Sequence, residues 1–330
     1  MGGTSLKKRI LTALLISALF LAGCSSASTS ETNEKEYKIG VLLSDTGLGD
    51  ESFNDSAFRG LEKARDELGI LFDYREAPDG DFESQLEELS KQDNDLVIGL
   101  GFSVQEALEK TAQNHPEQQY LLIDGVSELE NVTSITFKEH EGSFLVGMVA
   151  AMTSKNQKLG IIGGADVPVI HRFEKGFEQG AKYINPDISI SKEYANNFGD
   201  AALGKKIAEN QIKDGVDFIY PAAGFTGVGA IQAAQEKHIF TAGVDSDQYF
   251  VAEKAVVTSM MKNIDVAVFN MAEKLVKDGS IGTEVYELGL AEDGVGLAAI
   301  RNFTLSNEQK SAIESAKEKL TSGKITINLN

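Results

Sequence analysis

From Tyr37 onward, short apolar runs alternate with longer segments in which apolar residues recur every three or four positions. In the segment 52–68 the residues with this spacing are Phe53, Ala57, Leu61 and Ala64, as is typical of an amphipathic helix. The short runs predict strands over 37–44, 70–75, 96–100, 120–124, 159–163, 188–194, 218–221 and 238–244. The longer segments predict helices over 52–68, 82–91, 104–114, 140–153, 169–184, 201–213, 228–236 and 306–320.

The order of these elements predicts an α/β fold. Strand and helix alternate without hairpin signals, which indicates parallel sheets covered by helices on both faces. The predicted strands are more than one short open sheet usually holds, so we expect two doubly wound lobes. A TIM barrel is the rival fold. It would require one repeat size throughout, whereas this chain ends in short strands and a late helix.

Residues 1–23 have a different pattern. Lys7, Lys8 and Arg9 precede an apolar run over 10–23. This run of about 14 residues is shorter than the roughly 20 that span a bilayer, but it suits the core of a signal peptide. It ends in Leu21-Ala22-Gly23-Cys24, which resembles the bacterial lipobox. We therefore expect residues 1–23 to be a lipoprotein signal peptide.

The lipobox resemblance implies that Cys24 is acylated on its sulfur and becomes the new N-terminus. Acyl chains, such as palmitate, would then anchor the protein at the extracytoplasmic face of the cell membrane. The alternative is a cysteine packed as a small apolar residue in a core helix. Residues 24–36 are rich in Ser, Thr, Asn and Glu and predict a flexible tether.

Charge and cysteine content exclude several classes of function. The 330 residues carry 31 Lys and Arg against 50 Asp and Glu, a formal charge of −19. Such a chain lacks the basic surface that nucleic acids require, so we expect no nucleic-acid partner. A single cysteine excludes an internal disulfide framework and a zinc site of paired cysteines.

The motifs of common catalytic and cofactor sites are also missing. GxGxxG after a strand, HExxH, GxSxG and the aspartate-rich calcium loop do not occur. The segment 224–229 is rich in glycine but lacks the Lys-Ser/Thr pair of a phosphate-binding loop. We therefore expect no cofactor, no metal ion and no enzymatic activity, although missing motifs alone do not exclude an enzyme.

The residues that follow the predicted strands share one chemistry. In open α/β sheets, ligands bind beyond the carboxyl ends of the strands. Carboxylates and amides there suit hydroxyl and ring-nitrogen donors, and aromatic faces stack on a flat ring. No basic cluster is present for a phosphate, so a nucleoside fits best. The residues are Asp45, Asp124, Asp245, Asn54, Asn197, Phe53, Phe102, Phe198 and Phe225, with glycines between them.

Several of these positions also have simpler interpretations. Asp50 and Asp200 begin predicted helices and fit helix N-caps. Phe53 lies on the apolar stripe of its helix, where core packing would account for it. Asp245 at a strand end is a structural residue in many proteins.

Longer motifs resemble the basic membrane protein (Bmp) family of lipoproteins, which includes purine nucleoside receptors of the PnrA type. The resemblance implies a type I periplasmic-binding-protein fold with two lobes, a hinge of three crossovers and a ligand between the lobes. The motifs run in family order and read DTG (45–47), DESFN (50–54), EGSFLVG (141–147), NPD (185–187), FGD (198–200), GVDSDQY (243–249) and TSMMK (258–262).

The resemblance also implies lobe boundaries and partners. The N-terminal lobe would comprise 37–136 and 260–290, and the C-terminal lobe 137–259 and 291–330. The protein would be a monomer that captures a nucleoside by hinge closure, with purines favoured. It would then deliver the nucleoside to the permease and ATPase subunits of an ABC importer.

The resemblance also implies roles for specific residues. Phe53 matches the aromatic that stacks on the purine, and Tyr220 falls near a second stacking aromatic. Phe225 departs from the family's glycine at its position, and its ring would either add a stacking face or narrow the site. Asp45 and Asn54 match contacts to the base, and Asp245 with Lys262 matches contacts to the ribose. Gly101, Phe102, Asp124, Phe198 and Gly224 complete the expected binding set.

Two other functions remain open at this stage. One is a regulatory or sensor lipoprotein on the same fold. The other is an enzyme such as a nucleoside hydrolase, which would need clustered aspartates for calcium near the N-terminus. Here Asp45, Asp50 and Asp55 are spaced by five residues instead. The sequence does not rank guanosine, inosine, adenosine and the pyrimidine nucleosides.

Overall fold

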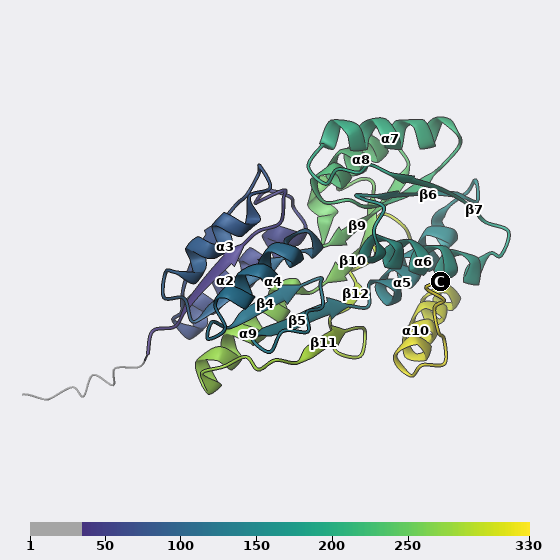
Figure 1. Cartoon of the computed structure of the whole chain (residues 1–330). Coiled ribbons are helices and arrows are strands. Elements are labelled where there is room, and N and C mark those ends of the chain that lie inside the picture. The colour runs from purple at the N-terminus through teal and green to yellow at the C-terminus, as the bar shows by residue number, and fades with distance from the viewer. Residues whose placement is uncertain (1–34) are drawn as a thin grey trace, which may run out of the picture. The chain divides into compact units, whose positions relative to one another are not determined.

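Two six-stranded sheets, both built from the segment Tyr37–Asn330, organise the computed structural model (Figure 1). The structure describes residues 35–330. The predicted signal peptide, Cys24 and nearly all of the predicted tether lie outside the described residues. Among the residues described, no helix has the length and hydrophobicity needed to cross a membrane.

The first sheet is entirely parallel, with the order β11-β5-β4-β3-β1-β2. Helices α2 and α9 pack together on one face, and α3 and α4 pack together against the other. The strands are β1 (Lys38–Leu42), β2 (Leu71–Arg75), β3 (Leu96–Leu100), β4 (Tyr120–Ile123), β5 (Val132–Phe137) and β11 (Val285–Leu288). The helices are α2 (Phe53–Leu68), α3 (Phe82–Ser90), α4 (Gln105–Asn114) and α9 (Ile264–Asp278), with a 3₁₀ turn η1 (Phe102–Val104) before α4.

The second sheet has the order β12-β10-β9-β8-β6-β7, and only the pair β10–β12 is antiparallel. Helices α5 and α6 pack as one pair, α7 and α8 as another, and α10 rests against α5. The strands are β6 (Lys158–Gly163), β7 (Ser189–Tyr194), β8 (Phe218–Ala222), β9 (Phe240–Asp245), β10 (Val256–Lys262) and β12 (Val295–Leu297). The helices are α5 (Glu139–Thr153), α6 (Pro168–Ile184), α7 (Ala201–Lys213), α8 (Gly224–Glu236), α10 (Asn307–Thr321) and the 3₁₀ turn η2 (Gln248–Val251).

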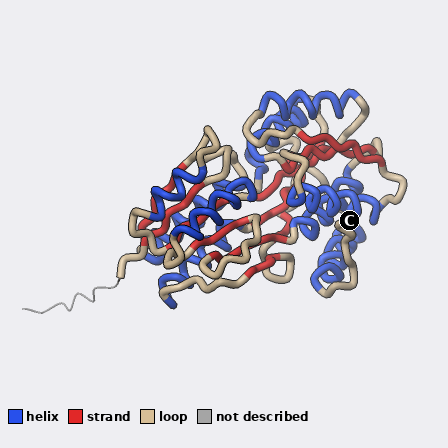
Figure 2. The backbone as a smooth tube through the Cα atoms, viewed as in Figure 1, coloured by secondary structure: helices blue, strands red, loops and turns tan. Residues whose placement is uncertain are grey.

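Strands and helices alternate in both halves, so each sheet lies between layers of helices (Figure 2). The central strands are apolar because both of their faces are covered, and every residue of β3 is buried. The pair α5–α6 is especially close. A Cβ atom at Gly180 would lie 1.9 Å from the carbonyl oxygen of Phe144, so only glycine permits this approach.

The chain passes between the sheets three times, which confirms the expected fold and excludes the TIM barrel. The crossovers follow β5, β10 and β11. β5 ends at Phe137 and β10 at Lys262, so each strand runs slightly past the lobe boundary expected from the sequence. The second crossover therefore lies just after Lys262 rather than at residue 260.

Candidate functional site

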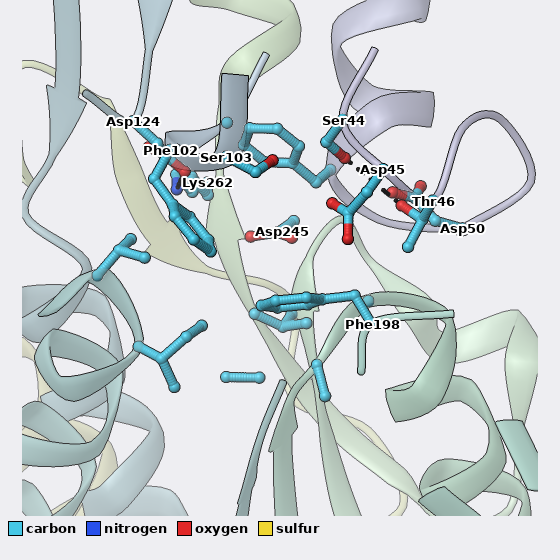
Figure 3. A pocket seen from close by; sticks show the side chains of 18 of the residues that line it. Ser44, Asp45, Thr46, Asp50, Phe102, Ser103, Asp124, Phe198, Asp245 and Lys262 are labelled. Carbon is cyan, nitrogen blue, oxygen red and sulfur yellow. Dashed lines mark hydrogen bonds and ion pairs between the residues drawn. The ribbon is translucent and has the colours of Figure 1, made fainter. Parts of the chain in front are cut away.

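A cavity with an empty volume of about 610 Å³ lies where the carboxyl ends of strands from both sheets meet. The residues of its first side follow β1, β3 and β4, and those of its second side follow or end β6, β7, β8, β9 and β10. Nine of the twelve residues expected to bind ligand line it: Asp45, Phe53, Gly101, Phe102, Asp124, Phe198, Gly224, Asp245 and Lys262. Figure 3 shows side chains from both halves around the cavity, with Asp245 between Asp45 and Lys262.

Aromatic rings form much of the cavity wall. Phe102 follows β3 and Phe198 follows β7, and their ring centroids lie 6.3 Å apart at an interplanar angle of 57°. Gly164 makes room for Phe198, because a Cβ atom there would lie 2.1 Å from the ring atom Cε1. Phe53 lines the cavity from the first turn of α2 and also packs against the core. The aromatic wall thus combines residues from both sheets.

Asn54 shapes one side of the cavity without lining it. Its buried side-chain amide donates to Ser44 Oγ at 2.8 Å, Thr46 Oγ1 at 2.9 Å and Asp50 Oδ2 at 3.0 Å. Its carbonyl oxygen accepts the backbone N–H of Ser44 at 3.0 Å. These bonds fix the loop that carries Asp45, whose carboxylate extends toward the cavity in Figure 3. Asn54 is therefore placed to position Asp45.

Asp50 serves the start of α2. Its buried carboxylate accepts the backbone N–H groups of Ser52, Asn54 and Asp55, as a capping carboxylate does. Burial raises the pKa of Asp50, although these hydrogen bonds favour the ionised form. The N-cap position of α2 is Ser52, so Asp50 caps the helix with its side chain from two residues before the position expected for it. Asp200 is the N-cap of α7 as expected and accepts the backbone N–H of Leu203.

Asp245 is the last residue of β9 and is buried. Its backbone has a φ of 62°, a left-handed conformation that aspartate tolerates better than most residues. Its Oδ2 accepts a hydrogen bond from Ser52 Oγ at 2.6 Å, which joins the two sides of the cavity. Burial raises the pKa of Asp245 to about 6, against the opposing effects of Lys262 and Ser52.

Lys262, the last residue of β10, is a buried cation on the cavity wall. Its Nζ lies 2.5 Å from Asp124 Oδ2 and 3.1 Å from Glu139 Oε1. Burial disfavours the ammonium ion, but Asp124, Glu139 and Asp245 together raise the pKa of Lys262. Lys262 therefore stays charged at neutral pH.

Asp124 follows β4, and its backbone also has a left-handed φ, of 65°. One carboxylate oxygen, Oδ2, binds Lys262, whereas Oδ1 is buried and lacks a hydrogen-bond partner within the described structure. Burial raises the pKa of Asp124. A buried acceptor without a partner is costly, so this oxygen is suited to accept a hydrogen bond from a ligand.

Three expected site residues do not line the cavity. One is Asn54, described above. The expectation that Tyr220 contacts the ligand is wrong: it is fully buried in the core, where its hydroxyl lies 3.1 Å from Ser143 Oγ and its ring packs on Phe177. Phe225 is also absent from the lining and is 37% exposed. Helix α8 begins at Gly224, four residues before the predicted start, so Phe225 occupies its first turn.

Sequence reasoning missed several lining residues. Val169, Ile170 and Phe173 belong to the first turns of α6, and Ser44, Thr46 and Ser103 follow strands. Ser44, Thr46 and Ser103 lie within a few residues of a strand end, so the rule that located Asp45 would also have indicated them. The α6 residues lie farther along the chain, within a helix, and that rule does not reach them. The described residues include no group of three His, Cys, Asp or Glu side chains arranged to hold a metal ion.

Known proteins resemble the chain over nearly its whole length. The model of the Bmp family, described as ABC transporter substrate-binding protein PnrA-like, matches residues 36–330. The "ABC transporter nucleoside-binding protein BmpA" of Lactococcus lactis is 33% identical, over 98% of this chain and 99% of that protein. "Basic membrane protein D" of Borreliella burgdorferi is 33% identical, over 86% and 85%. The "CD4+ T-cell-stimulating antigen" of Listeria monocytogenes is 32% identical, over 96% of each chain.

The fold also has a solved counterpart. An ABC transporter solute-binding protein from Aeropyrum pernix superimposes with a TM-score of 0.83 at 30% identity, over 89% of this chain and 94% of that one.

Proposed function

Because this chain belongs to the Bmp family of ABC transporter substrate-binding proteins, we propose that it is the nucleoside receptor of an ABC importer, with purine nucleosides preferred. The family is one of binding proteins rather than enzymes. The observation that carries the proposal is the cavity itself, which combines aromatic rings with buried carboxylates. The name of the Lactococcus relative, a nucleoside-binding protein, agrees with this chemistry.

Each part of a nucleoside has suitable partners in the cavity. A purine would stack on Phe53 and Phe198, while Asp45 accepts hydrogen bonds from its N–H groups. Stacking contributes about 1–3 kcal/mol per base in other proteins. Asp245 and Asp124 would accept hydrogen bonds from the sugar hydroxyls, at about 1.5–3 kcal/mol for a charged acceptor, and Lys262 would donate to them.

The same residues disfavour nucleotides. Lys262 is the lone lysine or arginine among the lining residues, and its charge is already shared between Asp124 and Glu139. A phosphate would therefore approach carboxylates without a free cation to receive it. The receptor should thus select the nucleoside over its 5′-phosphate.

Capture would proceed by hinge closure. Phe53 and Asp45 belong to the first side of the cavity, and Phe198 and Asp245 to the second. A nucleoside that touches both sides binds the closed form better and shifts the population toward it. Contacts between the sides assist closure: Arg59 donates to Ser246 Oγ at 2.6 Å, and Gln248 donates to the carbonyl oxygen of Glu51 at 3.0 Å.

The proposal includes a lipid anchor at Cys24. Acylation there would hold a monomeric receptor at the extracytoplasmic face of the membrane, beside the permease that accepts its ligand. In cells supplied with labelled palmitate, the protein should incorporate the label, and the variant Cys24→Ser should not. Equal labelling of both proteins would contradict the anchor at this residue.

Thermal unfolding tests the ligand class. A ligand that binds only the folded state raises its stability by RT ln(1 + [L]/Kd), about 2.7 kcal/mol at one hundred times Kd. After unfolding and refolding to remove carried ligand, the protein should gain several degrees with guanosine, inosine or adenosine. Ribose, free bases and nucleotides should have much smaller effects. A shift with sugars or nucleotides alone would contradict the proposal.

A further inference from the structure

Glu139 is a fully buried carboxylate that lies one contact behind the cavity wall. It is the first residue of α5, just after the crossover that follows β5. Arg172 of α6 binds it with two nitrogens, from Nε to Oε2 at 2.6 Å and from a terminal guanidinium nitrogen to Oε1 at 3.3 Å. Oε1 also lies 3.1 Å from Lys262 Nζ. Glu139 therefore links Arg172, which does not line the cavity, to Lys262, which does.

Carboxylates and aromatic rings surround the ammonium group of Lys262 and fix its orientation. Its ammonium lies between the carboxylates of Asp124 and Glu139. The rings of Phe53, Phe137 and Phe173 surround it at centroid distances of 5.2, 5.0 and 5.7 Å. An ammonium group has three N–H donors. One is donated to Asp124 Oδ2, whereas Glu139 forms an ion pair with the same nitrogen. Donor capacity therefore remains for a group in the cavity that Lys262 lines.

Glu139 also determines what Asp124 offers to a ligand. If Asp124 were the sole carboxylate beside Lys262, the buried ammonium would draw in both of its oxygens, because an unbalanced charge in a low-dielectric site is costly. With Glu139 sharing the charge, Lys262 binds Oδ2 of Asp124 and leaves Oδ1 without a partner. The unpaired Asp124 Oδ1 and the available Lys262 N–H thus both depend on Glu139, a residue that does not line the cavity.

We propose that Glu139, held by Arg172, is a positioning residue for sugar recognition: it orients Lys262 so that Asp124 Oδ1 and one Lys262 N–H face the ribose hydroxyls. The inference rests on the proposed nucleoside-binding function and assigns to Glu139 a role in recognising the sugar but not the base. Loss of Glu139 should therefore affect ligands according to their hydroxyl groups.

The test compares ligands that differ only in the sugar. Guanosine, inosine and adenosine, each paired with its 2′,3′-dideoxy form, are titrated calorimetrically into the wild type and into Glu139→Gln. The wild type should prefer each ribonucleoside. In the variant, ribonucleoside affinity should fall about tenfold or more, as expected for lost hydrogen bonds to charged groups. Dideoxynucleoside affinity should stay within about twofold. Glu236→Gln, which removes an exposed ion pair to Lys205 on α7, is the matched control and should change neither.

Arg172 provides a second variant if Glu139→Gln fails to fold. Arg172→Gln should reproduce the selective loss of ribonucleoside affinity, and Arg172→Lys, which keeps a cation beside Glu139, should restore part of it. An equal loss for both members of a ligand pair would show a role in the scaffold alone and would overturn the inference, as would unchanged affinity for both. A wild type that binds none of these ligands would instead remove the proposed function, and this inference with it.

Discussion

Asp245→Asn should make the ligand-free protein more stable at neutral pH while it impairs nucleoside binding. Burial raises the pKa of Asp245 to about 6, from an ordinary value of 3.8. Between these pH values the folded protein retains a proton that the unfolded chain has lost. Stability therefore falls as the pH rises through this window, and the loss is complete above pH 6. A pKa difference of this size corresponds to about 3 kcal/mol.

Asparagine removes the titration but keeps an oxygen that can accept the hydrogen bond from Ser52. The variant should thus gain up to about 3 kcal/mol in the free energy of unfolding at pH 7, and the gain should shrink toward zero near pH 4. Asp50 and Asp124 also have raised pKa values and are present in both proteins. Their charges help to raise the pKa of Asp245, so the difference measures the removal of the Asp245 charge together with its repulsion of these two carboxylates.

Urea unfolding of refolded, ligand-free protein at pH 4, 5, 6, 7 and 8 measures this difference. Asp79→Asn, on an exposed turn after β2, is the control and should not change the free energy of unfolding at any of these pH values. The reasoning would be refuted if Asp245→Asn were no more stable than the wild type at pH 7. It would also be refuted if the gain were the same at pH 4 and pH 7, because the carboxylate would then not be its source.

Three other predictions follow from the cavity. Phe198→Ala should weaken purine nucleoside binding by about 1–3 kcal/mol, the contribution of one stacking face, whereas Phe225→Ala should change it less than twofold in the same titration. Gly164→Ala should also weaken binding, because its Cβ would collide with the Phe198 ring. In a Phe198→Ala background the same change should weaken binding no further. An additive loss of affinity in the double variant would contradict this explanation. Nucleoside affinity should fall about tenfold per pH unit below pH 6, where Asp245 becomes protonated, and a pH-independent Kd between 5 and 7 would argue against Asp245 as the ionised acceptor.

The sequence predicted the alternation of strands and helices because several central strands, such as β3, are continuous apolar runs. The segment 96–100 was predicted with the bounds of β3 itself. It did not predict β10, in which Thr258, Ser259 and Lys262 interrupt the apolar pattern although all three are buried. It also missed strand β5 and helix α9, as well as β11 and β12, which have four and three residues and lie at sheet edges. Pairing with a neighbouring strand, which a single sequence does not show, stabilises such short segments.

Strand ends were the reliable guide to the cavity, since the carboxyl ends of parallel strands gather at one edge of a sheet. Asp45, Asp124 and Asp245 were found in this way. Tyr220 does not line the cavity because it lies within β8, where side chains alternate between the two faces of the sheet. Its own side chain packs in the core against Phe177. Glu139 gave no signal, because its importance depends on Arg172 and Lys262, which are distant in the sequence.

The most direct test of the central claim is calorimetric titration of the chain that begins after Cys24, unfolded and refolded beforehand to strip bound ligand. The titrants are purine and pyrimidine nucleosides, free bases, ribose and amino acids. Micromolar or tighter binding of a purine nucleoside, with bases and ribose at least about a hundredfold weaker, is the predicted result. Absence of binding to every nucleoside, by protein shown to be folded, would contradict the account.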